Sequence, residues 1–420
     1  MTTGDDRSTI LEVDGLTHRY GDELAVEDVS FGLVEGEIVA LLGPSGCGKT
    51  TIVNAIAGHL APTGGRIRLR GDDVTDTPPE SRRVGIVFQS STLFPHMTVA
   101  ENVAYGLREV DPADRDDCVS TYLDLVDLEE QRSAYPAELS GGQERRVELA
   151  RALAPEPDVL MLDEPLSALD PTLRERLSKE IARIQRETGV TTLFVTHDQA
   201  EAMTLADRLL VMTEGELAVV GEPRTLYESP PTPYVATFLG RSNALSATVA
   251  GTDPLSMAFD GSGESGTHAD PPSQTLRISK QGCEALSRGD TVVCHVRPEH
   301  LTLDVYSNPN GDVGESENAN APVDDAVNPT EERPNGLGRV RSESNTVVVD
   351  HTRGHASTCS LPGKVTGVLD RGRHYDVSVR LECGDELVVE RRREPPAVGT
   401  DVRVHLDGAD LTVFDTATGD

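Results

Sequence analysis

The chain has 420 residues, of which 71 are acidic and 38 basic, so its formal net charge is −33. A field this negative repels phosphate backbones and argues against nucleic acid as a partner. The six scattered cysteines indicate reduced thiols in a cytosol rather than a disulfide framework. Lysine is scarce, and this scarcity together with the acid excess favours a salt-rich cytoplasm, that of a halophile, where dissolved ions screen self-repulsion.

The first half of the chain alternates apolar runs with helical stretches. Residues 36–42, 158–162 and 191–196 are short apolar runs that predict buried strands. Helices are predicted from about 49 to 60 and over 172–187, where apolar residues recur on one face. Strands that alternate with helices favour an α/β fold with a parallel sheet covered on both faces.

A phosphate-binding loop is predicted between the first strand and its helix, where residues 43–50 are G-P-S-G-C-G-K-T. Lys49 is expected to reach the β and γ phosphates, and the Thr50 hydroxyl to ligate Mg²⁺. The alternative is a plain glycine-rich turn. The nucleotide-binding residues predicted here are Gly43, Pro44, Ser45, Gly46, Cys47, Gly48, Lys49, Thr50 and Thr51.

Two carboxylates, Asp163 and Glu164, follow the second predicted strand. Open α/β sheets hold their ligands at this end of their strands. Asp163 is predicted to hold Mg²⁺, and Glu164 to act as the general base on an attacking water. The alternative for such a pair is a solvated turn.

The pentapeptide L-S-G-G-Q at residues 139–143 resembles the signature of ABC transporter ATPases. Ser140 has the residue type of a helix N-cap, and Gln143 stands at the spacing of a capping box. Gly141 and Gly142 permit a γ phosphate to approach the helix N-terminus closely. A well-capped helix with no such role is the alternative.

The remaining motifs follow in that family's order, and the resemblance covers roughly residues 10–240. It implies that Tyr20 stacks on adenine, that Gln89 belongs to the Q-loop and that Asp170 closes the D-loop. His197 matches the switch histidine that contacts the γ phosphate. The implied catalytic residues are Glu164, His197 and Gln89, and the implied metal ligands are Thr50, Gln89 and Asp163.

The same resemblance implies a mechanism and partners. Two ATPase domains, expected to be a homodimer, pair head to tail, and each ATP lies between one P-loop and the other subunit's signature. ATP closes the pair and hydrolysis reopens it, which is a ligand-driven population shift. The expected partners are membrane permease subunits and, indirectly, an extracellular solute-binding protein. The expected location is the cytoplasmic face of the cell membrane, with ATP and Mg²⁺ bound.

The composition changes after Gly240 and divides the chain into predicted domains 1–240 and 241–420. Short alternating runs in the second domain predict strands, and residues 296–301 and 361–415 resemble an OB-like, all-β TOBE domain. An acidic stretch at about 305–345 predicts a disordered insertion.

Three possible zinc ligands recur every four residues in this second domain. His351, His355 and Cys359 would share one face of a helix. The surrounding glycine, serine and threonine residues disfavour that helix.

Residues 78–83 and 93–103 resemble a group of importer ATPases. The resemblance favours an inorganic ion, such as ferric iron, molybdate or tungstate, or a polyamine as the cargo. A sugar or a quaternary amine is the alternative within the family. A regulatory or non-transport ABC ATPase is the alternative of another class, although a single P-loop without heptad repeats disfavours it.

Overall fold

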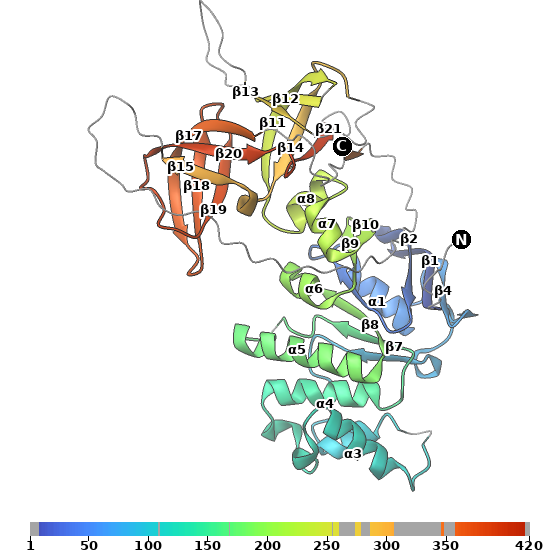
Figure 1. The fold of residues 1–420 in the computed structure, drawn as a ribbon. Helices are drawn as coiled ribbons and strands as arrows, with labels where there is room; N and C mark the ends of the chain where they lie inside the picture. The colour runs from blue at the N-terminus through green and yellow to red at the C-terminus, as the bar shows by residue number, and fades with distance from the viewer. Residues whose placement is uncertain are drawn as a thin grey trace, which may run out of the picture. The chain divides into compact units, whose positions relative to one another are not determined.

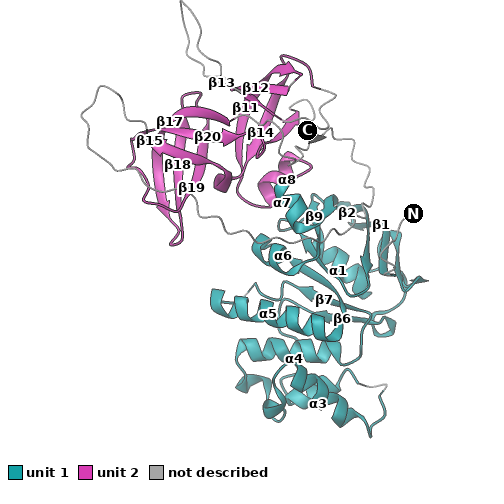
Figure 2. Ribbon diagram, viewed as in Figure 1, with its two compact units in different colours: residues 1–228 teal, residues 229–420 magenta. Residues whose placement is uncertain are grey.

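The computed structural model describes residues 8–107, 110–167, 169–253, 255–259, 274–278, 286–305, 346–347 and 358–415. The chain forms two compact units, residues 1–228 and 229–420 (Figure 2). No helix in these described ranges is both long and apolar enough to cross a membrane.

A six-stranded sheet in the order β10-β9-β3-β8-β7-β6 is the centre of the first unit (Figure 1). All neighbouring strands are parallel except β9 and β10, which form an antiparallel hairpin. The predicted α/β fold with a parallel sheet is therefore confirmed. The strands are β3 (Ile38–Leu42), β6 (Val84–Val87), β7 (Val159–Asp163), β8 (Thr191–Thr196), β9 (Arg208–Thr213) and β10 (Glu216–Gly221).

Both faces of this sheet are covered. Val39 and Leu41 of β3 belong to a buried cluster that also contains Ile52 of α1. Their alternates on the other face, Ala40 and Leu42, are equally buried. Successive side chains of a strand point to opposite faces, so a run that is buried throughout must have packing on both sides.

A second, antiparallel sheet in the order β2-β1-β4-β5 covers the other side of α1. Leu11 of β1 and Leu33 of β2 share the same buried cluster as Ile52, so the helix is held between the two sheets. The strands are β1 (Thr9–Tyr20), β2 (Glu23–Val34), β4 (Gly64–Leu69) and β5 (Asp72–Asp73).

Helices of the first unit follow the predicted periodicity, with differences at their ends. The helix α1 ends at Ala57, three residues earlier than predicted, because Gly58 adopts a φ of 83° and closes it. In α5, Leu177, Ile181 and Ile184 form the buried face. The helices are α1 (Lys49–Ala57), α2 (Val99–Ala104), α3 (Arg115–Leu125), α4 (Gly141–Leu153), α5 (Pro171–Thr188), α6 (Gln199–Leu205) and α7 (Pro223–Glu228).

The second unit opens with the short helix α8 (Pro233–Phe238) and continues as two antiparallel sheets, so the predicted all-β character is confirmed. Their orders are β13-β12-β11-β14-β21-β16 and β15-β20-β17-β18-β19, and one buried cluster draws on both. The strands are β11 (Asn243–Thr252), β12 (Leu255–Phe259), β13 (Gln274–Arg277), β14 (Thr291–Val296), β15 (Thr302–Val305), β16 (Thr346–Val347), β17 (Thr358–Asp370), β18 (Tyr375–Leu381), β19 (Glu386–Arg391), β20 (Asp401–Asp407) and β21 (Thr412–Asp415).

Two expectations for this unit fall largely on residues that the structure does not describe. The predicted disordered insertion lies outside the described residues from 306 to 345. His351 and His355 also lie outside them, while Cys359 is a buried residue of strand β17. Cys359 is therefore not on the helix that the four-residue spacing required. No group of three possible metal ligands occurs among the described side chains.

Candidate active site

The loop between β3 and α1 carries the predicted phosphate-binding residues. Gly48 precedes α1 with a φ of 99°, which glycine adopts without strain, and a Cβ there would lie 2.6 Å from the Ala25 carbonyl oxygen. The first backbone N–H groups of α1 and its positive dipole end face this loop, which is the arrangement that binds phosphate. Within it Pro44, Ser45, Gly46 and Thr50 are exposed, whereas Gly43, Cys47, Lys49 and Thr51 are buried.

Lys49 places its charge inside this loop. Its ammonium group donates to the carbonyl oxygens of Gly43 and Pro44, both at 2.8 Å, and the residue is only 7% exposed. The loop therefore brings one fixed positive charge to the start of α1, where the helix dipole also favours an anion.

Asp163 lies at the carboxyl end of β7 in an environment that disfavours its charge. Burial raises the pKa of the Asp163 carboxyl, and the neighbouring Glu164 carboxylate raises it further. The positive charges of Lys49 and Arg145 act in the opposite direction without cancelling the shift. A cation bound beside Asp163 would therefore stabilise the charged form of this carboxyl.

Three side chains from three neighbouring loops meet at Glu164. Gln89 comes after β6, Glu164 follows β7 and His197 follows β8, and these strands are adjacent in the sheet. The Gln89 Nε2 donates to Glu164 Oε2 at 2.9 Å, and His197 Nδ1 lies 3.0 Å from Glu164 Oε1. The structure therefore brings together the three residues predicted to be catalytic, with both carboxylate oxygens of Glu164 engaged.

The backbone of Glu164 is also fixed. Its φ is 45°, an unusual value for a residue with a side chain, and its N–H donates to the Val195 carbonyl oxygen of β8 at 2.9 Å. A left-handed residue of this kind costs roughly 1–3 kcal/mol and persists where its surroundings over-determine it. Strand β8 thus aims the Glu164 side chain as well as carrying His197.

The signature residues begin α4 in a complete capping box. The Gln143 backbone N–H donates to Ser140 Oγ at 3.4 Å, and the Ser140 N–H donates to Gln143 Oε1 at 2.9 Å. The predicted cap is confirmed. A groove of about 340 Å³ runs beside it. Ser140, Gly142, Gln143 and Leu173 are among its lining residues. This groove therefore belongs to the signature helix and to α5, and none of its lining residues comes from the P-loop.

A buried ion pair that sequence reasoning missed holds the segment after β6. Arg145 of α4 donates to the carbonyl oxygens of Phe88 and Gln89, at 2.5 and 2.9 Å, and to Glu148 Oε2 at 2.7 Å. Glu148 in turn accepts from the Thr92 N–H at 2.6 Å. Arginine and glutamate three residues apart on a helix give only a weak signal, because most such pairs are exposed.

The two other predicted residues lie at the ends of their elements. Tyr20, at the end of β1, is 51% exposed, and its ring packs edge-on against His18 at a centroid distance of 4.6 Å. Asp170 caps α5 by accepting from the Thr172 and Leu173 N–H groups at 3.0 and 3.1 Å. About half of the Tyr20 surface is therefore accessible to a ligand ring.

Comparisons with known proteins identify the families of both parts of the chain. Residues 26–167 match the ABC transporter family and residues 340–414 the TOBE domain. The spermidine/putrescine import ATP-binding protein PotA of Thermobifida fusca is 46% identical over 297 residues, which are 70% of this chain and 74% of that protein. The sulfate/thiosulfate import ATP-binding protein CysA 2 of Chromobacterium violaceum is 50% identical over 238 residues, 56% of this chain and 65% of that protein.

Solved structures of known proteins also match this chain. CbiO1 of Clostridium perfringens, part of the ABC transporter complex CbiONQ, is 32% identical. The match covers 52% of this chain and 90% of that one, with a TM-score of 0.49.

Replacing Arg145 tests how firmly the segment after β6 is held. We expect Arg145→Ala to lower the free energy of unfolding of the first unit by about 3–5 kcal/mol, because it leaves the Glu148 charge buried and unpaired. The double variant Arg145→Ala/Glu148→Ala should lose less than the sum of the two single variants. Urea unfolding measures these values, with the exposed Arg186→Ala of α5 as the control. Additive losses would contradict the pairing.

Replacing Asp163 by asparagine should raise the midpoint of thermal unfolding by about 2 °C or more, because the repelled carboxylate is removed. The pKa of this carboxyl is raised in the folded state. The gain is therefore full at neutral pH, declines as the pH falls through the raised pKa, and is gone below the unfolded value near 3.9. Melting curves between pH 8 and 5 test this, with the exposed Asp72→Asn as the control. A lower midpoint for Asp163→Asn at pH 7 would refute it.

Proposed function

The chain belongs to the ABC transporter family, as the ATP-binding and ATP-hydrolysing subunit of an importer, and we propose that its cargo is a polyamine. In such importers a separate permease provides the path through the membrane. The observation that best supports ATP hydrolysis is that Gln89 and His197 both contact the carboxylate of Glu164, in a fold that also contains a P-loop. These three residues are called the triad below.

The extent of the similarity supports a polyamine rather than another solute. The match to PotA of Thermobifida fusca spans 297 residues, so it continues well past residue 228, where the first unit ends. The match to the sulfate importer subunit spans 238 residues, about the length of the first unit alone. Motifs of the ATPase unit are common to importers of many solutes, so a likeness that extends into the second unit discriminates better between cargoes.

Each residue of the triad is proposed to have a distinct role. Glu164 accepts the proton of the attacking water while the water oxygen bonds to the γ phosphorus and the bond to ADP breaks. Gln89 donates to Glu164 Oε2 and orients this carboxylate. His197 contacts the other carboxylate oxygen, and its position after β8 suits it to sense the γ phosphate.

The residues proposed to hold Mg²⁺ offer the donors that this ion prefers. The Thr50 hydroxyl, the Gln89 amide oxygen and the Asp163 carboxylate are hard oxygen ligands. Asp163 fits because burial and Glu164 raise its pKa, which a nearby cation would reverse. When bound, Mg²⁺ supplies positive charge to the β and γ phosphates.

A pair of these chains is proposed to form the complete ATP site. Permease partners and pairing of ATPase subunits follow from the family, and we propose a homodimer at the cytoplasmic face of the membrane, served by an external solute-binding protein. The signature groove has no P-loop residue in its lining, which is consistent with a signature that serves another subunit's ATP. Each signature helix N-terminus then faces the ATP held by the other subunit's Lys49, Tyr20 and P-loop.

Glu164→Gln should bind ATP yet hydrolyse it at least about 100-fold more slowly, because the general base is lost. The variant should also dimerise when ATP is added, which size exclusion at high salt can detect. Lys49→Ala serves as the contrasting variant and should lose ATP binding itself. Near-normal turnover by Glu164→Gln would remove the role proposed for this carboxylate.

The cargo can be identified with the same trapped variant. Tagged Glu164→Gln, expressed in the native host and recovered from gently solubilised membranes, should copurify with a permease and a solute-binding protein. That binding protein should bind spermidine or putrescine in calorimetry. Binding of sulfate, iron, molybdate or a sugar instead would overturn the polyamine proposal. Recovery of soluble partners alone would indicate a regulatory or non-transport ATPase.

A further inference from the structure

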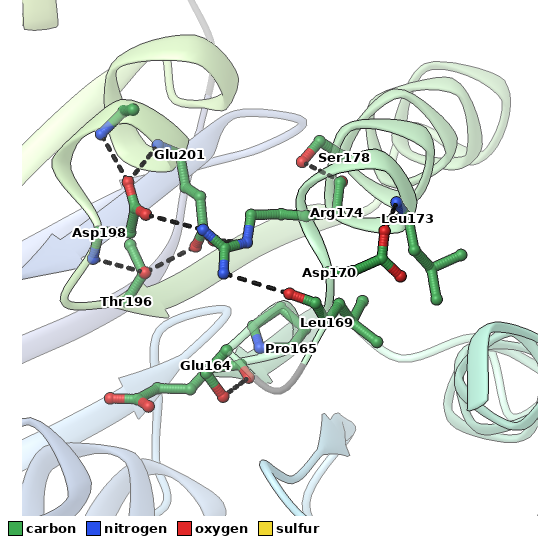
Figure 3. Close-up of polar contacts among 12 residues, drawn as sticks. Glu164, Pro165, Leu169, Asp170, Leu173, Arg174, Ser178, Thr196, Asp198 and Glu201 are labelled. Carbon is green, nitrogen blue, oxygen red and sulfur yellow. Dashed lines mark hydrogen bonds and ion pairs between the residues drawn. The ribbon is translucent and has the colours of Figure 1, made fainter.

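Arg174 of α5 reaches two different segments, one that contains Leu169 and one that contains Asp198 (Figure 3). Its Nη2 donates to the Leu169 carbonyl oxygen at 3.3 Å, on the segment between β7 and α5. Its Nη1 donates to Asp198 Oδ2 at 3.4 Å, on the loop between β8 and α6. Its Nε lies 3.5 Å from Glu201 Oε1 in the first turn of α6. A planar guanidinium is suited to hold several acceptors at once.

The loop after β8 is a closed hydrogen-bonded ring to which Arg174 is attached. Asp198 Oδ1 caps α6 by accepting from the Ala200 and Glu201 N–H groups at 2.9 and 3.2 Å. The Thr196 hydroxyl donates to Glu201 Oε2 at 2.7 Å and accepts from the Asp198 N–H at 2.9 Å. His197 stands between Thr196 and Asp198, so a shift of this ring moves the histidine.

The segment before α5 is similarly tied to Glu164. Ser167 Oγ donates to the Glu164 carbonyl oxygen at 3.0 Å. Leu169, whose carbonyl accepts from Arg174, directly precedes Asp170, the cap of α5. A displacement of Asp170 is therefore transmitted to Leu169 and, through Arg174, to the loop of His197.

Arg174 is one of the groups that oppose the effect of burial on the pKa of Glu201. The Glu201 side chain is only 7% exposed, and burial raises its pKa while the Thr196 hydroxyl and Arg174 oppose this shift. The three Arg174 contacts, at 3.3 to 3.5 Å, are longer than the roughly 2.7–2.9 Å of a tight charge-assisted hydrogen bond. The single chain therefore already forms these three contacts, and each of them could become shorter.

We propose that Arg174 is a positioning residue that couples the segment of Asp170 to the loop of His197, so that both reach their hydrolysis-competent positions together. The inference rests on the proposed function of Glu164 and His197. Asp170 lies at the start of α5 beside the signature groove, whose lining includes Leu173. Pairing of two chains at that groove would then be signalled to His197 through the arginine.

The test compares kcat with KM for ATP in the full chain. Arg174→Ala should lower kcat about tenfold, while KM and ATP binding stay within about twofold, because no contact to nucleotide is removed. The kcat of Arg174→Lys should lie between that of the wild type and that of Arg174→Ala, because one ammonium group keeps the charge but cannot bridge both loops. Arg186→Ala, three turns further along α5 and exposed, is the matched control and should keep the wild-type kcat.

A second variant protects the test against misfolding. Asp198→Asn keeps an oxygen that can cap α6 but removes the charge facing Arg174. It should lower kcat in the same way, and Arg174→Ala/Asp198→Asn should be no slower than the slower single variant. Melting temperatures report on folding of each variant.

The outcomes separate this inference from the proposed function. If the wild-type chain hydrolyses ATP and Glu164→Gln does not, but Arg174→Ala and Asp198→Asn keep normal kcat, the coupling is wrong and the function stands. A lower melting temperature with unchanged kcat assigns Arg174 to stability alone and also overturns the coupling. If Glu164→Gln is active, the proposed function itself fails.

Discussion

The parallel pairing of β6, β7 and β8 is the constraint on which the site depends. Parallel strands end at the same edge of a sheet, so the residues that follow them are gathered whatever their separation along the chain. Gln89, Glu164 and His197 meet in this way, although 75 residues separate the first two and 33 the last two. Strands β7 and β8 are buried almost throughout, so sliding either strand would disturb close packing on both faces of the sheet.

Two arginines connect the helices α4 and α5 to the segments that follow these strands. Arg145 of α4 binds the backbone after β6, and Arg174 of α5 binds the segment after β7 together with the loop after β8. In both places a buried glutamate, Glu148 or Glu201, receives the charge. Such pairs contribute little net stability when compared with apolar packing, but breaking one is costly, so they fix geometry. Their tightness differs, since the Arg145 contacts are short and those of Arg174 are long.

The site also retains unfavourable features. Asp163 and Glu164 are neighbouring carboxylates in partly buried surroundings, and Glu164 has a left-handed backbone. Such strain is common where binding of a ligand is to relieve it. A bound cation would stabilise the charge of the Asp163 carboxylate, which burial and the neighbouring Glu164 disfavour.

Several local elements of the fold, and the family, could be predicted from the sequence alone. The apolar run at residues 191–196 predicted β8 at its observed bounds, and the S-G-G-Q spacing predicted the capping box of α4, because these features depend on neighbours along the chain. Only the tertiary structure decided the sheet order, with β8 between β3 and β7, and with it the contacts of Glu164. The bridging roles of Arg145 and Arg174 were equally out of reach, since each also donates to backbone carbonyl oxygens on a distant segment, which no residue type reveals. Helix caps and strands depend on residues that are near in the sequence, so they can be predicted from it. Which strands and side chains from distant parts of the chain contact one another depends on packing of the whole sheet.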